Sequence, residues 1–253
     1  EAMREQAEKF GAEVVYDEVT DLDLDGDVKR VTLSDGTVHE GLSVIFATGS
    51  AYRKLGLSDE DRLSGHGVSW CATCDGFFFR EQVIAVVGGG DSAMEEASFL
   101  TKFADKVIVI HRKDSLRASK VMQDRAFANP KIEFVFNSEV VGIEGDAAVT
   151  GLRLRDTVTG AESDLAVTGL FIAIGADPRT HLVHGKLDLT DAGTSAVDGR
   201  TSRTSIPGVF AAGDVVDPTY RQAVTAAASG TVAALDVEHD LAGLDSELLA
   251  STH

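Results

Sequence analysis

The first part of the chain has a hydrophobic pattern that predicts one helix followed by antiparallel strands. Residues 1–11 carry apolar side chains at helical spacing, among them Met3 and Phe10, and end in a glycine. Segments rich in β-forming residues follow, separated by Asp-Gly pairs, at residues 14–16, 28–33 and from 38 onward. This order predicts a β-meander.

Three longer apolar runs each end in a glycine turn, at residues 43–49, 169–175 and 208–214. The first run shows no polar alternation, so we expect a parallel strand that is covered on both sides. The third run leads into an alanine-rich stretch, from about residue 219 to 241, that we expect to be helical.

The middle of the chain alternates strand and helix patterns. We expect strands at 83–88, 106–111 and 131–136, and helices at about 91–103 and 118–128. This βαβαβ order predicts an α/β fold with a parallel sheet. Short alternating strands resume over 139–168. We expect a middle domain at 50–177, inserted between segments 1–49 and 178–253 that together form a second domain.

The glycine turn after the first of these middle strands has the pattern of a dinucleotide-binding loop. Residues 86–93 read VVGGGDSA, a G-x-G-x-x-A between an apolar strand and a helical pattern. Gly88 permits a tight turn, Gly90 lets the backbone approach a pyrophosphate, and Ala93 allows close helix–strand packing. A glycine triplet alone would also fit a turn without ligand, but the flanking pattern favours a nucleotide. The predicted residues are Gly88, Gly90, Asp91, Ser92 and Ala93.

The segment after the second strand, where the ribose of a dinucleotide is expected, is basic. Residues 111–120 carry four positive charges and one negative charge. The whole chain has 23 Lys and Arg against 41 Asp and Glu, a net charge of −18. This local reversal favours a 2′-phosphate, and therefore NADP(H) over NAD(H). Alternatively, these positive charges belong to the start of a helix, where they are solvated and bind no ligand.

The two cysteines of the chain lie in one motif, Cys71-Ala-Thr-Cys74, with Asp75 directly after it. Two cysteines do not complete a four-ligand zinc site, and His66 and His111 lie at no usual ligand spacing, so we expect no metal. The spacing favours a redox pair instead. Asp75 could then move the proton that dithiol chemistry requires, or it is a turn residue before a glycine.

Composition excludes several classes of partner. A strongly acidic chain is disfavoured as a binder of nucleic acid. We expect no membrane span, because no apolar run approaches the length of one, and no secretory signal. The two cysteines form no disulfide framework of the secreted kind, so a reducing cytoplasm is the expected location.

A nicotinamide and a disulfide need an intermediary, because the first donates a hydride and the second accepts electrons through sulfur. A flavin is the usual one, so we expect FAD. The glycine turns at Thr48-Gly49 and Gly213-Asp214 would then lie beside the flavin, with Asp214 in reach of the ribityl hydroxyls.

Four segments together resemble the low-molecular-weight thioredoxin reductases, namely residues 71–76, 88–93, 111–117 and 208–222. The resemblance extends along the chain. It implies two Rossmann-like three-layer domains of the ββα type, as in the FAD- and NAD(P)-binding disulfide oxidoreductases. It also implies a homodimeric flavoprotein that passes electrons from NADPH through FAD to the cysteine pair and then to thioredoxin.

The resemblance assigns roles to individual residues. Cys74 would form the flavin-facing thiolate, Cys71 would attack the thioredoxin disulfide, and Asp75 would be the acid–base. The expected NADPH residues also include His111, Arg112, Lys113 and Arg117, with Arg112 and Arg117 on the 2′-phosphate. Gly175 is expected to bind a cofactor, without a choice between the two. The expected FAD residues are Thr48, Gly49, Gly213, Asp214, Arg221, Gln222 and Ala223. The family rotates its two domains against each other, which would place hinges at about 49–53 and 174–178.

The sequence departs from the family pattern at two places. Lys113 stands where the family more often has arginine, which keeps the charge but loses a bidentate contact. Family members also begin with a strand and a G-x-G-x-x-G that holds the FAD pyrophosphate, whereas this sequence opens in what corresponds to a later helix. We therefore expect a first domain that is incomplete by truncation and a chain that holds NADPH better than FAD. Loss of the FAD fingerprint could also leave the chain inactive alone.

Two other functions fit parts of the pattern. One is a related flavoprotein, such as the reductase subunit of an alkyl hydroperoxide system or a small-molecule dithiol oxidase. The residues between the cysteines and the pair Arg112 and Arg117 favour thioredoxin reductase over these. The other is an NADPH-binding module without catalysis, which flavin absorbance that bleaches with NADPH would exclude.

Overall fold

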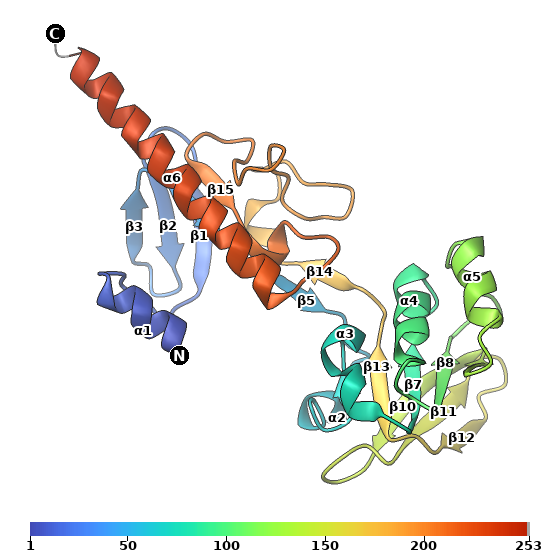
Figure 1. The fold of residues 1–253 in the computed structure, drawn as a ribbon. Helices are drawn as coiled ribbons and strands as arrows, with labels where there is room; N and C mark the ends of the chain where they lie inside the picture. The colour runs from blue at the N-terminus through green and yellow to red at the C-terminus, as the bar shows by residue number, and fades with distance from the viewer. Residues whose placement is uncertain (252–253) are drawn as a thin grey trace. The chain divides into compact units, whose positions relative to one another are not determined.

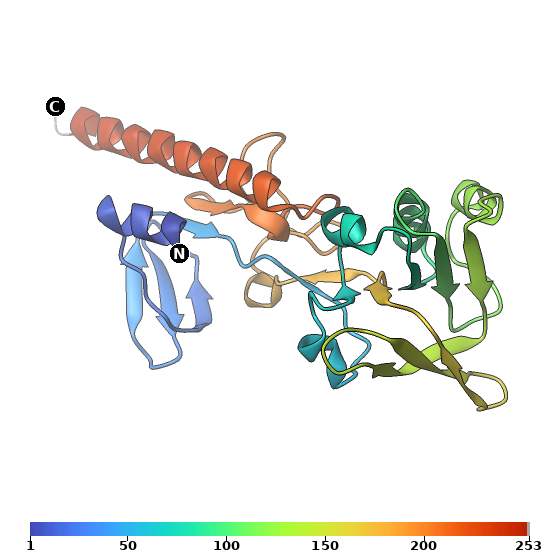
Figure 2. The same ribbon diagram turned by 60° about the horizontal axis from the view of Figure 1, so that its bottom comes forward.

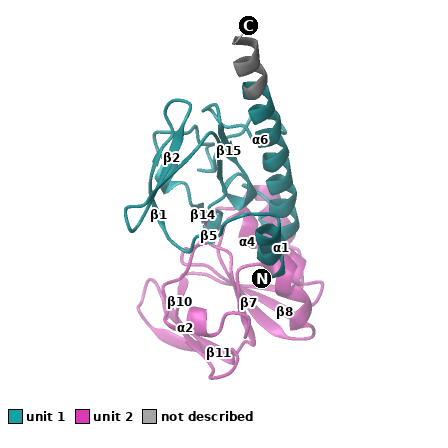
Figure 3. Ribbon diagram, turned by 90° about the vertical axis from the view of Figure 1, so that its left-hand side faces the viewer, with its two compact units in different colours: residues 1–51, 177–253 teal, residues 52–176 magenta. Residues whose placement is uncertain are grey.

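The computed structural model describes residues 1–251, with side chains described through residue 244. The chain forms two compact units (Figure 3). Unit 1 consists of Glu1–Ala51 and Asp177–His253, and unit 2 consists of Tyr52–Ala176. The two chain segments that connect the units, β5 (Ser50–Tyr52) and β14 (Ala176–Pro178), pair as a two-stranded sheet.

A five-stranded parallel sheet forms the centre of unit 2, in the order β6-β13-β7-β8-β9. The strands are β6 (Val68–Ser69), β7 (Val83–Val87), β8 (Lys106–Ile110), β9 (Ile132–Val135) and β13 (Gly169–Ile172). In the sequence, α4 (Asp91–Leu100) lies between β7 and β8, and α5 (Lys120–Phe127) lies between β8 and β9. The predicted βαβαβ order and parallel sheet are confirmed.

Both faces of this sheet are covered, which gives three layers (Figures 1 and 2). Helices α4 and α5 and the short α3 (Ala72–Asp75) pack on one face, where Ile84 and Val86 of β7 point. The other face, where Ala85 and Val87 point, packs against an antiparallel meander of β10 (Ser138–Glu144), β11 (Gly151–Asp156) and β12 (Glu162–Leu165). Alternate side chains of one apolar strand thus enter two separate cores. The remaining elements of this unit are α2 (Asp59–Arg62) and η1 (Gly76–Phe79).

Unit 1 contains smaller sheets and one long helix (Figure 1). Strands β1 (Val19–Asp23), β2 (Lys29–Leu33) and β3 (Val38–Gly41) form an antiparallel meander, and β4 (Val44–Phe46) pairs in parallel with β15 (Val209–Ala211). Its core holds Leu22, Phe46, Val183 and Val209. The helical elements are α1 (Ala2–Lys9), η2 (His181–Val183), η3 (Gly213–Val215) and α6 (Ala223–Ser251).

Three expectations for unit 1 were wrong in detail. Residues 14–16 form no strand, and Val15 and Tyr16 are 54% and 77% exposed; the meander starts at β1, where Leu22 is buried. β4 is not covered on both sides, because Ile45 is 42% exposed. α6 begins four residues later than expected. The Asp217 carboxylate accepts the backbone N–H groups of residues 219–221 and so holds this segment in a turn.

Among the residues that the structure describes, none of the helices combines the length and the apolar character needed to cross a bilayer.

Candidate functional site

The glycine turn between β7 and α4 is tightly packed on one side and open on the other. A Cβ at Gly88 would lie 2.5 Å from the Ala173 carbonyl oxygen and 2.6 Å from the Ala93 Cβ, and its φ of +156° is one that other residues rarely adopt. A Cβ at Gly90 would meet no atom within 4 Å. Close packing of Ala93 and open space at Gly90 are the two features that a phosphate-binding turn requires.

The basic segment folds against this turn. The backbone N–H groups of Arg117 and Ala118 donate to the Gly89 carbonyl, at 2.7 and 3.0 Å. The His111 ring lies directly against Gly89, where a Cβ would be 2.3 Å from Nδ1. Residues that are far apart in the sequence therefore form one wall, and position 89 must be glycine because the imidazole occupies the space of a side chain.

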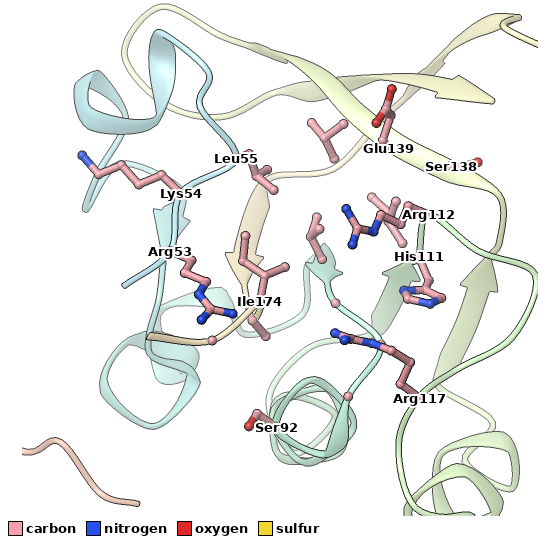
Figure 4. A pocket seen from close by; sticks show the side chains of 18 residues that line it. Arg53, Lys54, Leu55, Ser92, His111, Arg112, Arg117, Ser138, Glu139 and Ile174 are labelled. Atoms are coloured by element: carbon pink, nitrogen blue, oxygen red, sulfur yellow. The ribbon is translucent and has the colours of Figure 1, made fainter. Parts of the chain in front are cut away.

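This wall lines a cavity of about 580 Å³ in unit 2 (Figure 4). Of the residues of unit 2 predicted to bind a cofactor, those that line it are Gly88, Gly90, Ser92, His111, Arg112, Arg117 and Gly175. Asp91, Ala93 and Lys113 do not line it. Ala93 is fully buried under Gly88, and the Asp91 carboxylate accepts the Ser119 N–H at 2.6 Å, which joins the starts of α4 and α5.

Three charged residues that line this cavity were not predicted from the sequence. Arg53 and Lys54 line it from the segment that was interpreted only as a crossover, and Glu139 lines it from β10. In Figure 4, Arg53 lies across the cavity from Arg112 and Arg117. The Arg53 N–H donates to the Gly175 carbonyl at 3.0 Å. The two adjacent positive charges at positions 53 and 54 were the sequence feature that could have predicted this wall of the cavity.

The cavity is electropositive. Within the described part of the chain, Arg112, Lys113 and Arg117 make no ion pair with any acidic residue. Burial lowers the pKa of His111, which the charges of Arg117, Arg112 and Lys113 lower further, while a hydrogen bond to the Ser115 backbone acts in the opposite direction. His111 Nε2 is buried without a hydrogen-bond partner among the described residues. Unpaired cations beside open backbone N–H groups can bind phosphate.

The Cys-x-x-Cys motif forms the start of α3 in the same unit. Cys71 and Cys74 are joined by a disulfide, and the Cys74 N–H donates to the Cys71 Sγ at 3.2 Å. Buried Ser69 connects the pair to Asp75. Its hydroxyl donates to Asp75 Oδ2 at 2.7 Å and accepts the Cys71 N–H at 3.0 Å. The disulfide and the adjacent carboxylate are therefore held in one hydrogen-bonded turn, and Ser69 is a residue that sequence analysis did not single out.

Some of the residues predicted for the flavin lie on segments of unit 1 that are hydrogen-bonded to one another. Thr48 Oγ1 donates to the Arg179 carbonyl at 2.7 Å. Ser50 Oγ donates to the Asp214 carbonyl at 3.0 Å, which ties β5 to η3. The Gly213 N–H donates to Ser229 Oγ of α6 at 2.7 Å. Three segments from the two ends of the chain thus meet around Asp214.

Two polar atoms in this region are buried without a hydrogen-bond partner among the described residues, Asp214 Oδ1 and Arg221 Nε. Arg221 also has a positive φ of 49°. Buried polar groups normally have partners, so both atoms are suited to a polar ligand such as a hydroxyl or a phosphate. Gln222 precedes α6, and Ala223 is its first residue.

Within the described residues, no group of three or more His, Cys, Asp or Glu side chains is arranged to hold a metal ion.

The sequence and the fold correspond to a known family. The sequence profile of the pyridine nucleotide-disulphide oxidoreductases matches residues 2–230. The chain therefore belongs to this family.

Within the family, the chain is of the bacterial thioredoxin reductase type. It is 64% identical to the thioredoxin reductase of Streptomyces clavuligerus over 98% of this chain and 77% of that protein. It is 58% identical to the thioredoxin reductase of Mycolicibacterium smegmatis, over 96% of this chain and 78% of that protein. The crystal structure of the Streptococcus pyogenes thioredoxin reductase superposes with a TM-score of 0.90 at 44% identity, covering 96% of this chain and 79% of that chain.

Proposed function

We propose that this chain reduces the disulfide of thioredoxin with electrons from NADPH, through FAD and the Cys71–Cys74 pair. One observation carries the proposal: a disulfide with a Cys-x-x-Cys spacing and a cation-lined cavity beside a G-x-G-x-x-A turn are built into the same compact unit. The high identity to proteins named thioredoxin reductase supports the same conclusion. A homodimer and a cytoplasmic location are further proposals that rest on the resemblance.

The residues of unit 2 fit NADPH. The N–H groups at the start of α4 would bind the pyrophosphate, since Gly90 leaves that side of the turn open. Arg112 and Arg117 would hold the 2′-phosphate, because both line the cavity without an ion pair among the described residues. Arg53, on the opposite wall of the cavity, would contact a second part of the dinucleotide. Ser92 would contact the pyrophosphate as well.

The residues of unit 1 fit part of an FAD site. Asp214 would accept hydrogen bonds from the ribityl chain, and Arg221 would donate to a phosphate, since each has a buried atom without a partner among the described residues. When bound, the nicotinamide supplies a hydride and the flavin relays its two electrons to the disulfide. Unit 1 would be the FAD domain and unit 2 the NADPH domain.

The cysteine pair would then reduce thioredoxin by thiol–disulfide exchange. The Cys71 thiolate attacks one sulfur of the thioredoxin disulfide, which breaks that bond and forms a mixed disulfide. Cys74 attacks Cys71 Sγ, which releases the second thioredoxin sulfur and restores the Cys71–Cys74 disulfide. Each released thioredoxin thiolate takes one proton. Asp75, whose carboxylate accepts a hydrogen bond from Ser69, would deliver protons beside the pair.

The direct test is a stoichiometric assay of the purified protein supplied with FAD, NADPH and oxidised thioredoxin. We expect two thioredoxin thiols for each NADPH consumed. NADPH consumption without thioredoxin thiols would contradict the proposed substrate. Thiols formed equally well from a peroxide-system disulfide partner would favour the related reductases instead.

Ser69→Ala should slow thioredoxin reduction about tenfold, because it leaves the Asp75 carboxylate and the Cys71 N–H without the hydroxyl that holds them. Stopped-flow measurement should show NADPH-driven flavin reduction at the wild-type rate. Ser69→Thr, which keeps the hydroxyl, should recover most of the activity. Equal activity of the alanine variant would show that Asp75 needs no support from Ser69.

A further inference from the structure

A buried carboxyl group holds the chain segment that forms one wall of the cavity in unit 2. Glu60 lies on α2 and is 1% exposed, although glutamate is seldom buried without partners. Its Oε2 accepts the backbone N–H of Leu55 at 2.9 Å, and its Oε1 accepts that of Leu57 at 2.6 Å. Both carboxyl oxygens therefore bind the segment that directly follows the cavity residues Arg53 and Lys54.

Helix α2 is attached to the rest of unit 2 through residues other than Glu60. The Arg62 guanidinium donates to the Gly145 carbonyl at 2.8 Å, in the turn between β10 and β11. Leu63, which directly follows the helix, is buried in the core between the sheet and the meander. The helix is thus a fixed support, from which Glu60 holds residues 55–57.

Residues 55–57 have a backbone conformation that needs such a support. Gly56 lies between the two bonded residues with a φ of +87°, and a Cβ there would meet no atom within 4 Å. Glycine has more backbone freedom than any other residue, so an unsupported segment would sample many conformations. The two hydrogen bonds to Glu60, one on each side of Gly56, select the observed conformation.

Arg53 extends from this segment towards the cavity. Its backbone N–H donates to the Gly175 carbonyl at 3.0 Å, and a Cβ at Gly175 would lie 3.4 Å from its Nη1. In Figure 4 the Arg53 side chain points into the cavity, whereas the Lys54 side chain points away from it. Lys54 pairs with Asp61 of α2 at 2.5 Å. Arg53 is therefore the residue that brings positive charge from this wall into the cavity.

We propose that Glu60 is a positioning residue that fixes Arg53 in the cavity wall, and so sets the affinity for the nicotinamide half of the dinucleotide. This inference rests on the nucleotide role proposed above for the cavity. The start of α4, which would bind the pyrophosphate, lies between the two walls. A dinucleotide with its 2′-phosphate on Arg112 and Arg117 therefore directs its other half towards Arg53. The Arg117 backbone is bonded to Gly89, so that wall does not depend on Glu60.

The effect of Glu60 on affinity follows from the flexibility of arginine. A guanidinium binds a phosphate or another polar group best when its N–H groups are already directed at the ligand, because ordering a long side chain on binding costs entropy. Without the two hydrogen bonds to Glu60, residues 55–57 relax and Arg53 loses its fixed position over Gly175. The nicotinamide half of the ligand then binds more weakly, and the 2′-phosphate is held as before.

Glu60→Gln tests this inference, because glutamine keeps one acceptor oxygen and replaces the other with an amide nitrogen. Calorimetric titrations of the purified protein, supplied with FAD, compare NADP⁺ with 2′,5′-ADP, which carries the 2′-phosphate but lacks the nicotinamide half. We expect E60Q to weaken NADP⁺ by about three- to tenfold and 2′,5′-ADP by less than about twofold. A cavity that is distorted as a whole would weaken both ligands equally, and that result would overturn the inference.

Asp59→Asn is the matched control, because Asp59 lies on the same helix and its carboxylate pairs with Arg62 at 2.8 Å. It should change the affinity for either ligand by less than about twofold. If E60Q does not fold, Glu60→Asp takes its place. Its shorter side chain cannot reach both N–H groups, so the same difference between the two ligands is expected.

A double-mutant cycle shows whether Glu60 acts through Arg53. Arg53→Met alone should weaken NADP⁺ and spare 2′,5′-ADP, and its exposed position makes misfolding no concern. In the R53M background, E60Q should weaken NADP⁺ by less than about a further twofold, because the two residues act as one unit. Losses that multiply in full, or an R53M variant that binds NADP⁺ as the wild type does, would contradict the inference.

Hydrogen exchange followed by mass spectrometry measures the support directly, without any nucleotide. Peptides that contain residues 53–57 should exchange faster in E60Q than in the wild type, and peptides that contain residues 112–117 should exchange at the same rate. Equal exchange of residues 53–57 in the two proteins would show that Glu60 does not fix this segment.

Failure of the proposed function gives a different result. A wild-type protein that binds neither NADP⁺ nor 2′,5′-ADP would contradict the nucleotide role of the cavity. The exchange measurement would then still decide whether Glu60 fixes the segment that carries Arg53.

Discussion

Cys71→Ser should abolish NADPH-dependent reduction of thioredoxin, with a loss of at least about a thousandfold in kcat/KM, while NADPH still bleaches the flavin absorbance of the loaded protein. Serine cannot form the mixed disulfide with thioredoxin, and it removes one sulfur of the Cys71–Cys74 bond. Electron entry needs the nucleotide cavity, which contains neither cysteine. Steady-state turnover and anaerobic stopped-flow reduction separate the two half-reactions.

Thr73→Ser is the matched control, because Thr73 lies between the two cysteines and is exposed. It should retain turnover within about twofold. Thioredoxin turnover that persists in Cys71→Ser would show that Cys71 is not the residue that attacks thioredoxin. Loss of flavin reduction in the same variant would show that the substitution disturbs more than the exchange step.

Arg117→Ala should weaken NADPH binding by about tenfold to a hundredfold and leave NADH binding nearly unchanged. A charge-assisted hydrogen bond contributes about 1.5–3 kcal/mol, and NADH lacks the 2′-phosphate that would receive it. The Arg117 side chain lines the cavity, while its backbone N–H is fixed on Gly89 and does not depend on the side chain. The alanine variant should therefore preserve the glycine turn.

Arg125→Ala is the matched control for this prediction, since Arg125 lies on α5 and does not line the cavity. Calorimetric or fluorescence titrations of both nucleotides should show no change in preference for that variant. Equal losses for NADPH and NADH in Arg117→Ala would place the 2′-phosphate elsewhere, and Arg112→Ala would be the next variant to test.

Much of unit 2 was predictable because its signals are local. The apolar strand before Gly88 and the helical pattern after it together span about twenty residues, and both elements form as expected. The spacing of Cys71 and Cys74 similarly predicts a disulfide within one turn, which the structure contains. In unit 1 the same signals were less reliable. The apolar segment 14–16 has strand propensity, but it contributes no buried side chain, so the tertiary structure overrides its local preference.

By itself, the sequence determined the α/β class, the strand and helix order of the middle of the chain, and the residue types that redox and phosphate chemistry require. These follow from periodicity and from motifs within short segments. Only the tertiary structure placed His111 against Gly89, Arg53 across the cavity and Ser69 on Asp75. The physical reason is that burial and hydrogen bonding between packed elements depend on which faces meet. A pattern along one segment records which face is apolar, but not which polar group from another segment will lie against it.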